Sequence, residues 1–230
     1  MTSVQDAAAK PKRFVSERGP FEIFANPEMS SGYTWEGVDV HKAVANWEIG
    51  RLAEKYGEAA VRAKLAEMLE ALAGGMVVTG LFCQGDRDSE TMRQLNPTGM
   101  SVAHIWIGPH FPLFSHSHPA HGDCLYFVTA GELVMGSRRL RAGSVFFLPN
   151  GHPYKYSGGA DGVEYLEIRA GPGTEGAPGM VIHEHSLESI QRIIDQANAH
   201  RHEWHAPKEI GGTALREAER LLGLGSQDVA

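Results

Sequence analysis

The sequence predicts a mainly β fold, an antiparallel sandwich or barrel with helices before and after it. From residue 76 to about residue 168 the chain consists of short β-branched and aromatic runs closely punctuated by Gly, Pro, Asn or Asp, a pattern typical of antiparallel strands joined by tight turns. Apolar residues recur at helical spacing on both sides of this region. At 230 residues, 42% hydrophobic and 21% charged, the chain fits one elaborated globular domain.

Residues 1–75 should form an N-terminal tail and a helical extension. The first 20 residues are polar and broken by Pro and Gly, which favours a tail without a packed core. The apolar stripes of the two helices that follow are more consistent with packing than with a cofactor site. The expected elements are an extended segment at 21–25, a helix at 40–56 and a helix at 58–73, with Gly57 between the helices and Gly74 after the second.

Residues 76–183 should form the β-barrel, and residues 184–230 the C-terminal helices. Ser186 is placed to cap the first of these helices and Thr213 the last, because a side-chain oxygen there can bond a free N–H of the first turn. Both helices are expected to pack outside the barrel. Strands are expected at 76–83, 100–107, 125–129, 133–135, 145–148, 154–156, 163–168 and 180–183.

Charge and composition argue against a nucleic-acid partner or a membrane protein. The formal net charge is −7, and the densest basic cluster, Arg138–Arg141, is short and expected at a hairpin end. No apolar run approaches the ~18 residues that span a bilayer, and the N-terminus lacks a signal pattern. Two cysteines are too few for a disulfide framework. We therefore expect a cytoplasmic protein.

His116 and His118 are the most informative residues of the chain. Side chains alternate along a strand, so two histidines separated by one residue point the same way and can reach one metal ion. The spacing alone is weak evidence, because surface strands also carry such pairs. The residues that follow make a metal site the stronger interpretation.

The order of residues around this pair resembles the two signature motifs of the cupin superfamily. The H-x-H pair precedes an acidic residue and Gly131, and five residues after Gly143 lead to Pro149 and Gly151. The resemblance covers about residues 100–170. It implies a cupin-type antiparallel β-barrel, or jelly roll, that binds one divalent transition metal (Fe, Zn, Ni or Mn).

Two positions depart from the cupin pattern of three histidines and one glutamate. The spacing from His118 places Asp123 at the acid, whereas counting back from Gly131 places Cys124 at the glutamate position. Asp123 can supply a carboxylate, Cys124 can supply a thiolate, or both can be structural. A thiolate favours zinc, while a carboxylate also suits ferrous iron, manganese or nickel. Asp123 is the slightly favoured ligand.

The second motif should continue to a histidine, but Tyr154 stands at that position. A neutral phenol is a poor ligand unless its pKa is depressed, so this change predicts weaker metal binding or catalysis by the phenol. His152 lies two residues earlier, in the turn, and can swing into the site. Tyr126 shares a face with Cys124 and is the second candidate acid or base.

The runs His116–Ala120 and Cys124–Tyr126 look like the motif of cupin lyases that cleave dimethylsulfoniopropionate (DMSP). In those lyases a metal-bound acid is followed two positions later by a catalytic tyrosine, and helices precede the barrel as they do here. The cavity is expected to be aromatic with few cations, which fits a small, partly apolar organic substrate. The expected lining is His104, Trp106, Tyr126, Phe146 and Tyr154, with His152 at the turn.

The remaining histidines lie outside these motifs. His110 and His121 fall in predicted loops and are expected in solvent. His200, His202 and His205 straddle the predicted end of a helix, at a density that resembles a metal site. Solvated histidines at a helix C-terminus, where the helix dipole favours them, are the simpler interpretation.

Two functions are open on the sequence alone. The favoured one is a bacterial-type, metal-dependent enzyme in which His116 and His118 hold the metal and Tyr126 or Tyr154 is the acid or base. Its chemistry would be that of a dioxygenase, lyase or isomerase, and the fold does not choose among these. The alternative is a non-catalytic cupin that binds a small ligand with weak or no metal. The N-terminal segment and helices suit dimer contacts, so we expect a homodimer.

Overall fold

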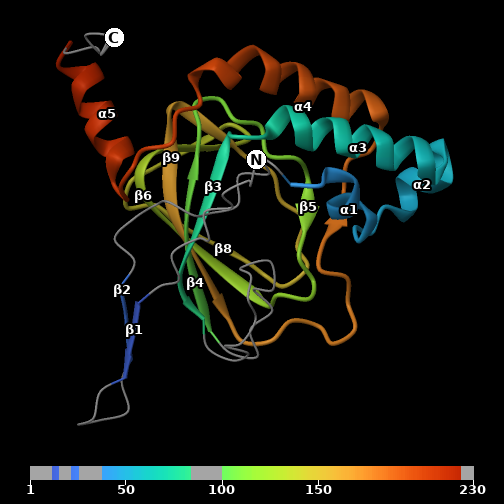
Figure 1. Ribbon diagram of the computed structural model, residues 1–230, viewed down its shortest axis with the longest axis horizontal. Coiled ribbons are helices and arrows are strands. Elements are labelled where there is room, and N and C mark those ends of the chain that lie inside the picture. The colour runs from blue at the N-terminus through green and yellow to red at the C-terminus, as the bar shows by residue number, and fades with distance from the viewer. Residues whose placement is uncertain (1–11, 16–21, 26–37, 84–99, 224–230) are drawn as a thin grey trace, which may run out of the picture.

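The computed structural model describes residues 12–15, 22–25, 38–83 and 100–223, drawn with their labels in Figure 1. An antiparallel sheet core is flanked by helices from both ends of the chain. The helices are α1 (Val40–Ala45), α2 (Gly50–Tyr56), α3 (Glu58–Leu72), α4 (Leu187–His200), the 3-10 helix η2 (Arg201–Glu203) and α5 (Gly212–Leu221). The strands are β1 (Lys12–Val15), β2 (Glu22–Ala25), β3 (Met76–Cys83), β4 (Ser101–Ile107), β5 (His116–Ser117), β6 (Asp123–Met135), β7 (Arg138–Arg141), β8 (Val145–Leu148), β9 (Ser157–Ala170) and β10 (Val181–Ile182).

The main sheet has the strand order β3-β4-β9-β6-β7, and β8 also pairs with β6. Every pair in it is antiparallel. β6 is 13 residues long, so β8 and β7 can occupy successive stretches of its free edge. The predicted mainly β class with terminal helices is confirmed. The pairings among the described residues do not by themselves close this sheet into a barrel.

Strand pairing determines which side chains share a face, because directly paired residues of an antiparallel sheet lie on the same side. Tyr126 pairs with Phe146 on β8 and with Glu167 on β9, and Tyr126 is fully buried. Leu125 and Phe127 point to the opposite side, and each is 37% exposed. The first half of β6 therefore defines an inner face and an outer face of the sheet.

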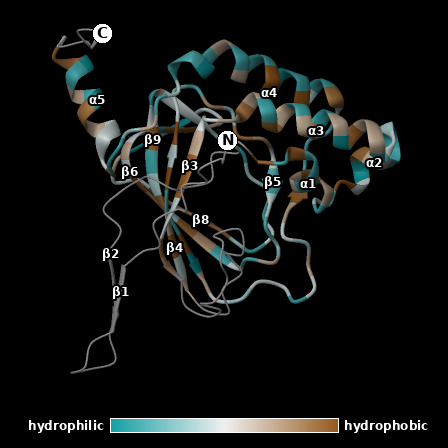
Figure 2. Cartoon of the chain, in the orientation of Figure 1, coloured by the Kyte–Doolittle hydropathy of each residue, from teal (hydrophilic) through white to brown (hydrophobic). Residues whose placement is uncertain are grey.

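Helices from opposite ends of the chain pack against each other. α3 and α4 lie side by side beyond one end of the sheet (Figure 1). Leu65, Met68 and Leu72 of α3 are buried, as are Ile190 and Ile194 of α4. Figure 2 shows α4 as a largely hydrophilic helix interrupted by apolar residues, as expected for a helix with one buried stripe. The N-terminal helical extension and the C-terminal helices therefore share one apolar layer.

The helical region before Gly57 differs from the prediction. The expected helix at 40–56 is interrupted between α1 and α2. There the Glu48 N–H donates to the Met180 carbonyl (3.0 Å), and the Ile182 N–H donates to the Glu48 carbonyl (2.9 Å). This pairing with β10 uses backbone groups that a continuous helix would need. The predicted break at Gly57, which has φ +83°, is confirmed.

The strands around Gly131 also differ from the prediction. The residues expected as two strands, 125–129 and 133–135, lie in the single strand β6. Gly131 has φ +69° beside a shift in register, so the strand bends without ending. Arg138–Arg141, expected only at a hairpin end, is itself strand β7. Two of its arginines bond the carboxylate of Glu132 on β6, at 2.5 and 3.1 Å.

Other segments depart less from the prediction. Of residues 154–156, which were expected to form a strand, only Tyr154 forms an isolated bridge, and β9 begins at Ser157. β1 lies where part of a polar tail was expected, and it pairs antiparallel with β2, which lies in the extended segment expected at 21–25. The rest of that tail lies outside the described residues. Among the described helices, none combines the length and the apolarity needed to cross a bilayer.

The two C-terminal helices begin in different ways. Ser186 caps α4 as predicted, since its hydroxyl accepts an N–H of the first turn at 3.1 Å. The predicted cap at Thr213 is corrected, because α5 begins one residue earlier and Thr213 lies inside it. The N–H groups of Gly211 and Thr213 donate to the carboxylate of Glu164 on β9, at 2.5 and 2.7 Å. A carboxylate from the sheet therefore takes the place of the expected hydroxyl cap.

Replacing Glu164 with Gln tests this contact. Burial raises the pKa of Glu164, but bonds from His104, Gly211 and Thr213 outweigh it and hold the pKa below the ordinary 4.5. A lowered carboxyl pKa stabilises the fold above the ordinary pKa, and this contribution is lost as pH falls through the folded value. We expect E164Q to lower the unfolding free energy by about 2–4 kcal/mol at neutral pH.

That loss should shrink when urea unfolding is repeated at a pH below the folded pKa of this carboxyl. Glu219→Gln, an exposed change on α5, is the matched control. If E164Q lost the same unfolding free energy at both pH values, Glu164 would not be the charged acceptor at the start of α5.

Candidate functional site

Backbone pairing brings the two predicted motifs together. The His116 N–H donates to the Tyr154 carbonyl (3.2 Å), and the Tyr154 N–H donates to the His116 carbonyl (3.0 Å). The two rings consequently lie 4.5 Å apart between centroids. On its other side β5 pairs with β10, where Ile182 stands opposite His116. The strand that carries the H-x-H pair is therefore held between two neighbouring segments.

Both imidazoles of the pair have a tautomer that leaves Nε2 free to bind a metal. His116 Nδ1 lies 2.9 Å from the Phe114 carbonyl, and His118 Nδ1 lies 2.8 Å from the Gly179 carbonyl. A carbonyl oxygen only accepts, so each Nδ1 carries a proton and each Nε2 keeps a free lone pair. The ring centroids are 4.8 Å apart. Metal-binding histidines are commonly oriented by partners of this kind.

Burial keeps these histidines neutral. It lowers the pKa of His116 to about 4, against the opposing bond to Phe114. Burial, and then the neighbouring His116, lower the pKa of His118 well below its ordinary value. His121 was expected in solvent but is only partly exposed, and it stacks on His118 with centroids 5.0 Å apart. At neutral pH the lone pairs of His116 and His118 are therefore available to a metal.

A small pocket lies beside His118. Its volume is about 10 Å³, close to the minimum for one water molecule. Five of the predicted site residues line it: His118, Cys124, Tyr126, His152 and Tyr154. The other lining residues are Gly122, Leu148, Pro149, Gly151 and Arg169. The structure therefore joins residues from both motifs around one small hollow.

Two tyrosines of the pocket are hydrogen-bonded to each other. The Tyr126 hydroxyl donates to the Tyr154 hydroxyl at 3.1 Å. Phe146 stacks on Tyr126 with ring centroids 4.5 Å apart and an interplanar angle of 4°, so it supports the pocket rather than lining it. Burial raises the pKa of both tyrosines. Both phenols therefore remain protonated at neutral pH.

The structure separates the two candidate acid ligands. Cys124 is 4% exposed and lines the pocket. Asp123 is exposed, and its Oδ1 accepts the N–H of Asn150 at 2.8 Å, so it holds the turn after β8. Burial raises the pKa of the Cys124 thiol, which is therefore protonated in the absence of a metal. Among the described residues, no third His, Cys, Asp or Glu atom forms a compact group with His116 and His118.

Sequence reasoning missed an ion pair on the inner face. Arg169 Nε lies 2.6 Å from Glu167 Oε1, and Arg169 is 4% exposed. Because Glu167 pairs with Tyr126, strand alternation places both charges on the tyrosine side of the sheet. The pocket thus contains one guanidinium, although few cations were expected. The available signal was a pair of opposite charges two residues apart, at the end of the strand expected at 163–168.

The expectation that His104 and Trp106 line the cavity is corrected. His104 pairs with Leu166, which in turn pairs with Phe127 on the outer face. His104 and Trp106 therefore lie on the face opposite Tyr126, and both are fully buried there. Their spacing showed that they share a face, but spacing does not determine which side of the sheet that face is on.

Comparison with known proteins gives a distant likeness of fold. No protein-family model matches the chain, and neither does any curated protein. A cupin-like protein of unknown function from Ralstonia eutropha is 16% identical, over 56% of this chain and 75% of that one, with a TM-score of 0.34. The DMSP lyase DddQ from Ruegeria pomeroyi is 21% identical, over 47% of this chain and 51% of that one, with a TM-score of 0.34.

An HTH_3 family transcriptional regulator from Vibrio cholerae is 19% identical, over 43% of this chain and 52% of that one, with a TM-score of 0.32. The structural neighbours include proteins described as cupin-like, a DMSP lyase and a transcriptional regulator, each at low identity and a TM-score of at most 0.34. Enzymes and a regulator both occur among them. A shared fold does not determine an activity, which depends on the residues of the site.

Replacing His116 and His118 together with Ala should remove one equivalent of bound metal, because both imidazole lone pairs are lost. Elemental analysis of tag-free protein, before and after reconstitution, measures this. The double variant His185→Ala, His205→Ala is the control, since it removes two exposed histidines outside the pocket. Equal metal contents in the two double variants would contradict the site.

Proposed function

We propose that this protein is a metal-dependent enzyme of the cupin type that acts on a small organic molecule. His116 and His118 would hold the metal, and Tyr126 and Tyr154 would carry the proton. One observation supports this most strongly: two neutral imidazoles with free Nε2 atoms lie next to a hydrogen-bonded pair of phenols. A neutral imidazole nitrogen with a free lone pair is a common metal ligand, and one divalent metal can accept both lone pairs.

The residues present fit a metal that keeps open positions. Two imidazoles suit zinc, nickel, iron or manganese, and the remaining positions are left to solvent or substrate. Cys124 is the nearest candidate for a third ligand because it lines the same pocket, and a coordinating thiol gives up its proton. A bound metal would supply Lewis acidity, polarising a carbonyl or carboxylate oxygen of the substrate.

The side chains around the metal position have separate tasks. Tyr154, which accepts from Tyr126, is placed to pass its own phenolic proton to the substrate as a general acid. Arg169 offers a charged partner for a substrate carboxylate, and Glu167 orients the guanidinium. These proton-carrying groups favour lyase or isomerase chemistry on a small, partly apolar carboxylate. Oxygenase chemistry would need iron at the same position.

A non-catalytic cupin that binds a small ligand is the second candidate. The pocket volume of about 10 Å³ admits one water and nothing larger. A substrate therefore needs movement of pocket side chains such as His152, which is exposed. A protein that takes up no metal on reconstitution would support this second candidate.

Replacing Tyr154 or Tyr126 with Phe should lower kcat by about 10²- to 10⁴-fold with little change in KM, because proton transfer is lost while binding is kept. The metal-loaded protein would be assayed on a panel of small carboxylates that includes DMSP, followed as release of dimethyl sulfide. Oxygen uptake is recorded in parallel for the iron-loaded form. Tyr56→Phe, on α2, is the control. Unchanged turnover in both pocket variants would contradict the tyrosine assignment.

We also propose that two copies of the chain pair through the outer face of β6 and β8. Leu125 stands opposite Phe147 and Phe127 opposite Val145. These four outward side chains are between 37% and 55% exposed, and contiguous exposed apolar side chains are typical of an interface. A second copy can present the same patch about a two-fold axis. The resemblance to cupins, which usually pair through their sheets, supports this arrangement.

Phe147→Glu should convert the dimer to a monomer, because each interface would gain two unpaired charges. Light scattering across a dilution series measures the mass. Leu215→Glu, on the exposed side of α5, adds the same charge outside the patch and should leave the dimer intact. A monomeric mass for the unaltered protein at every concentration would reject the dimer.

A further inference from the structure

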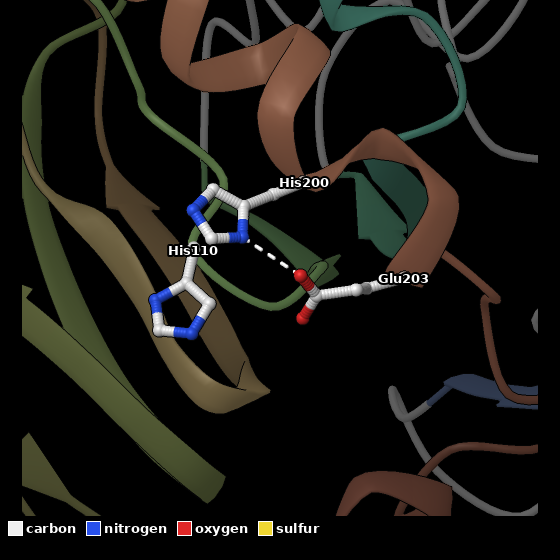
Figure 3. A group of neighbouring side chains, drawn as sticks. All are labelled: His110, His200 and Glu203. Atoms are coloured by element: carbon white, nitrogen blue, oxygen red, sulfur yellow. Dashed lines mark hydrogen bonds and ion pairs between the residues drawn. The ribbon is translucent and has the colours of Figure 1, made fainter.

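A second group of side chains with potential metal-ligand atoms lies outside the pocket (Figure 3). His110, His200 and Glu203 each place one possible ligand atom within 4.8 Å of the others. Figure 3 shows the two rings close together, with the carboxylate beside His200. We propose that these residues bind a zinc-type divalent cation, which ties the end of α4 to the loop after β4.

His110 is held in place by its backbone. Its φ is +55°, in the left-handed region that side-chain-bearing residues rarely adopt. The His110 N–H donates to the Gly159 carbonyl at 3.1 Å. The Gln196 side-chain amide donates to the His110 carbonyl at 2.9 Å. Such a conformation persists only where the surroundings fix it, and such residues cluster at functional sites. β9 and α4 thus fix the position of the His110 backbone.

His200 and Glu203 approach His110 from a single turn. His200 ends α4 and Glu203 ends η2, and residues three apart on a helix share a face. His200 Nδ1 lies 2.8 Å from Glu203 Oε1. The rings of His200 and His110 have centroids 4.4 Å apart. All three side chains are partly exposed, so an ion can enter from solvent without unfolding.

The donor set is one that zinc uses in proteins. Two imidazole nitrogens and one carboxylate oxygen hold zinc with a fourth position open. Zinc bond lengths of about 2.0–2.2 Å place the ligand atoms roughly 3.3 Å apart, so small side-chain rotations suffice to close this group around an ion. His202 is 74% exposed, and its Nε2 lies 3.9 Å from Glu203 Oε1. It is the nearest candidate for the fourth ligand.

The ion would strengthen a contact that already exists. Trp204 follows Glu203 and donates from Nε1 to the Pro109 carbonyl at 2.8 Å. Its ring centroid is 5.3 Å from that of Phe111. A Cβ at Gly108 would lie 2.4 Å from the Trp204 ring, so the loop approaches closely because glycine stands there. The cation and the tryptophan therefore join the same two segments, and the role of the site is structural.

Zinc titration of the His116→Ala, His118→Ala variant isolates this site from the pocket. We expect that protein to bind one equivalent of zinc. Adding His200→Gln or Glu203→Gln should weaken binding at least tenfold, because each change removes a ligand. His205→Gln is the control, an exposed histidine of the same segment. Circular dichroism spectra confirm that each variant is folded.

A thermal readout accompanies the titration. At a hundredfold excess over the control Kd, zinc should raise Tm by about 5 °C in the control and by at most about half of that in the ligand variants. Zinc binding that is equally tight in the His200→Gln and control proteins would overturn the proposal, as would no binding in either. Because the pocket histidines are absent throughout, these outcomes leave the proposed enzymatic function untouched.

Discussion

The reciprocal hydrogen bonds between His116 and Tyr154 are the constraint on which the candidate site depends. They join the two-residue strand β5 to the segment that follows the turn after β8. Tyr154 then reaches Tyr126 on β6, so one backbone pair links three segments around the pocket. The chemistry of the phenols and the imidazoles is therefore coupled through main-chain geometry, which side-chain substitutions leave in place.

Features of the fold that are encoded locally could be predicted from the sequence. The break at Gly57, the cap at Ser186 and most strands follow from nearby residues. What could not be predicted depends on distant partners. The gap between α1 and α2 exists because Glu48 pairs with β10, and α5 starts where Glu164 of β9 can accept its N–H groups. No window of consecutive residues contains both members of either contact.

The candidate site likewise has a part that could be predicted from the sequence and a part that could not. Period-two spacing placed His116 with His118 and Cys124 with Tyr126, and both members of each pair do share a segment or face. Residue spacing does not determine which side of β4 faces the pocket, so the prediction that His104 lines the cavity was wrong. The group formed by His110 and the end of α4 had only a weak signal, the density of histidines near residue 200, because its members come from different elements.

The packing of α3 against α4 bears on how the chain is made. Synthesis proceeds from the N-terminus to the C-terminus, so α3 leaves the ribosome well before α4. Until α4 is complete, Leu65, Met68 and Leu72 have only the short helices α1 and α2 and the growing sheet to cover them. Folding therefore cannot be finished in the order of synthesis, because the side of α3 that packs against α4 stays open until residues 187–200 have been made.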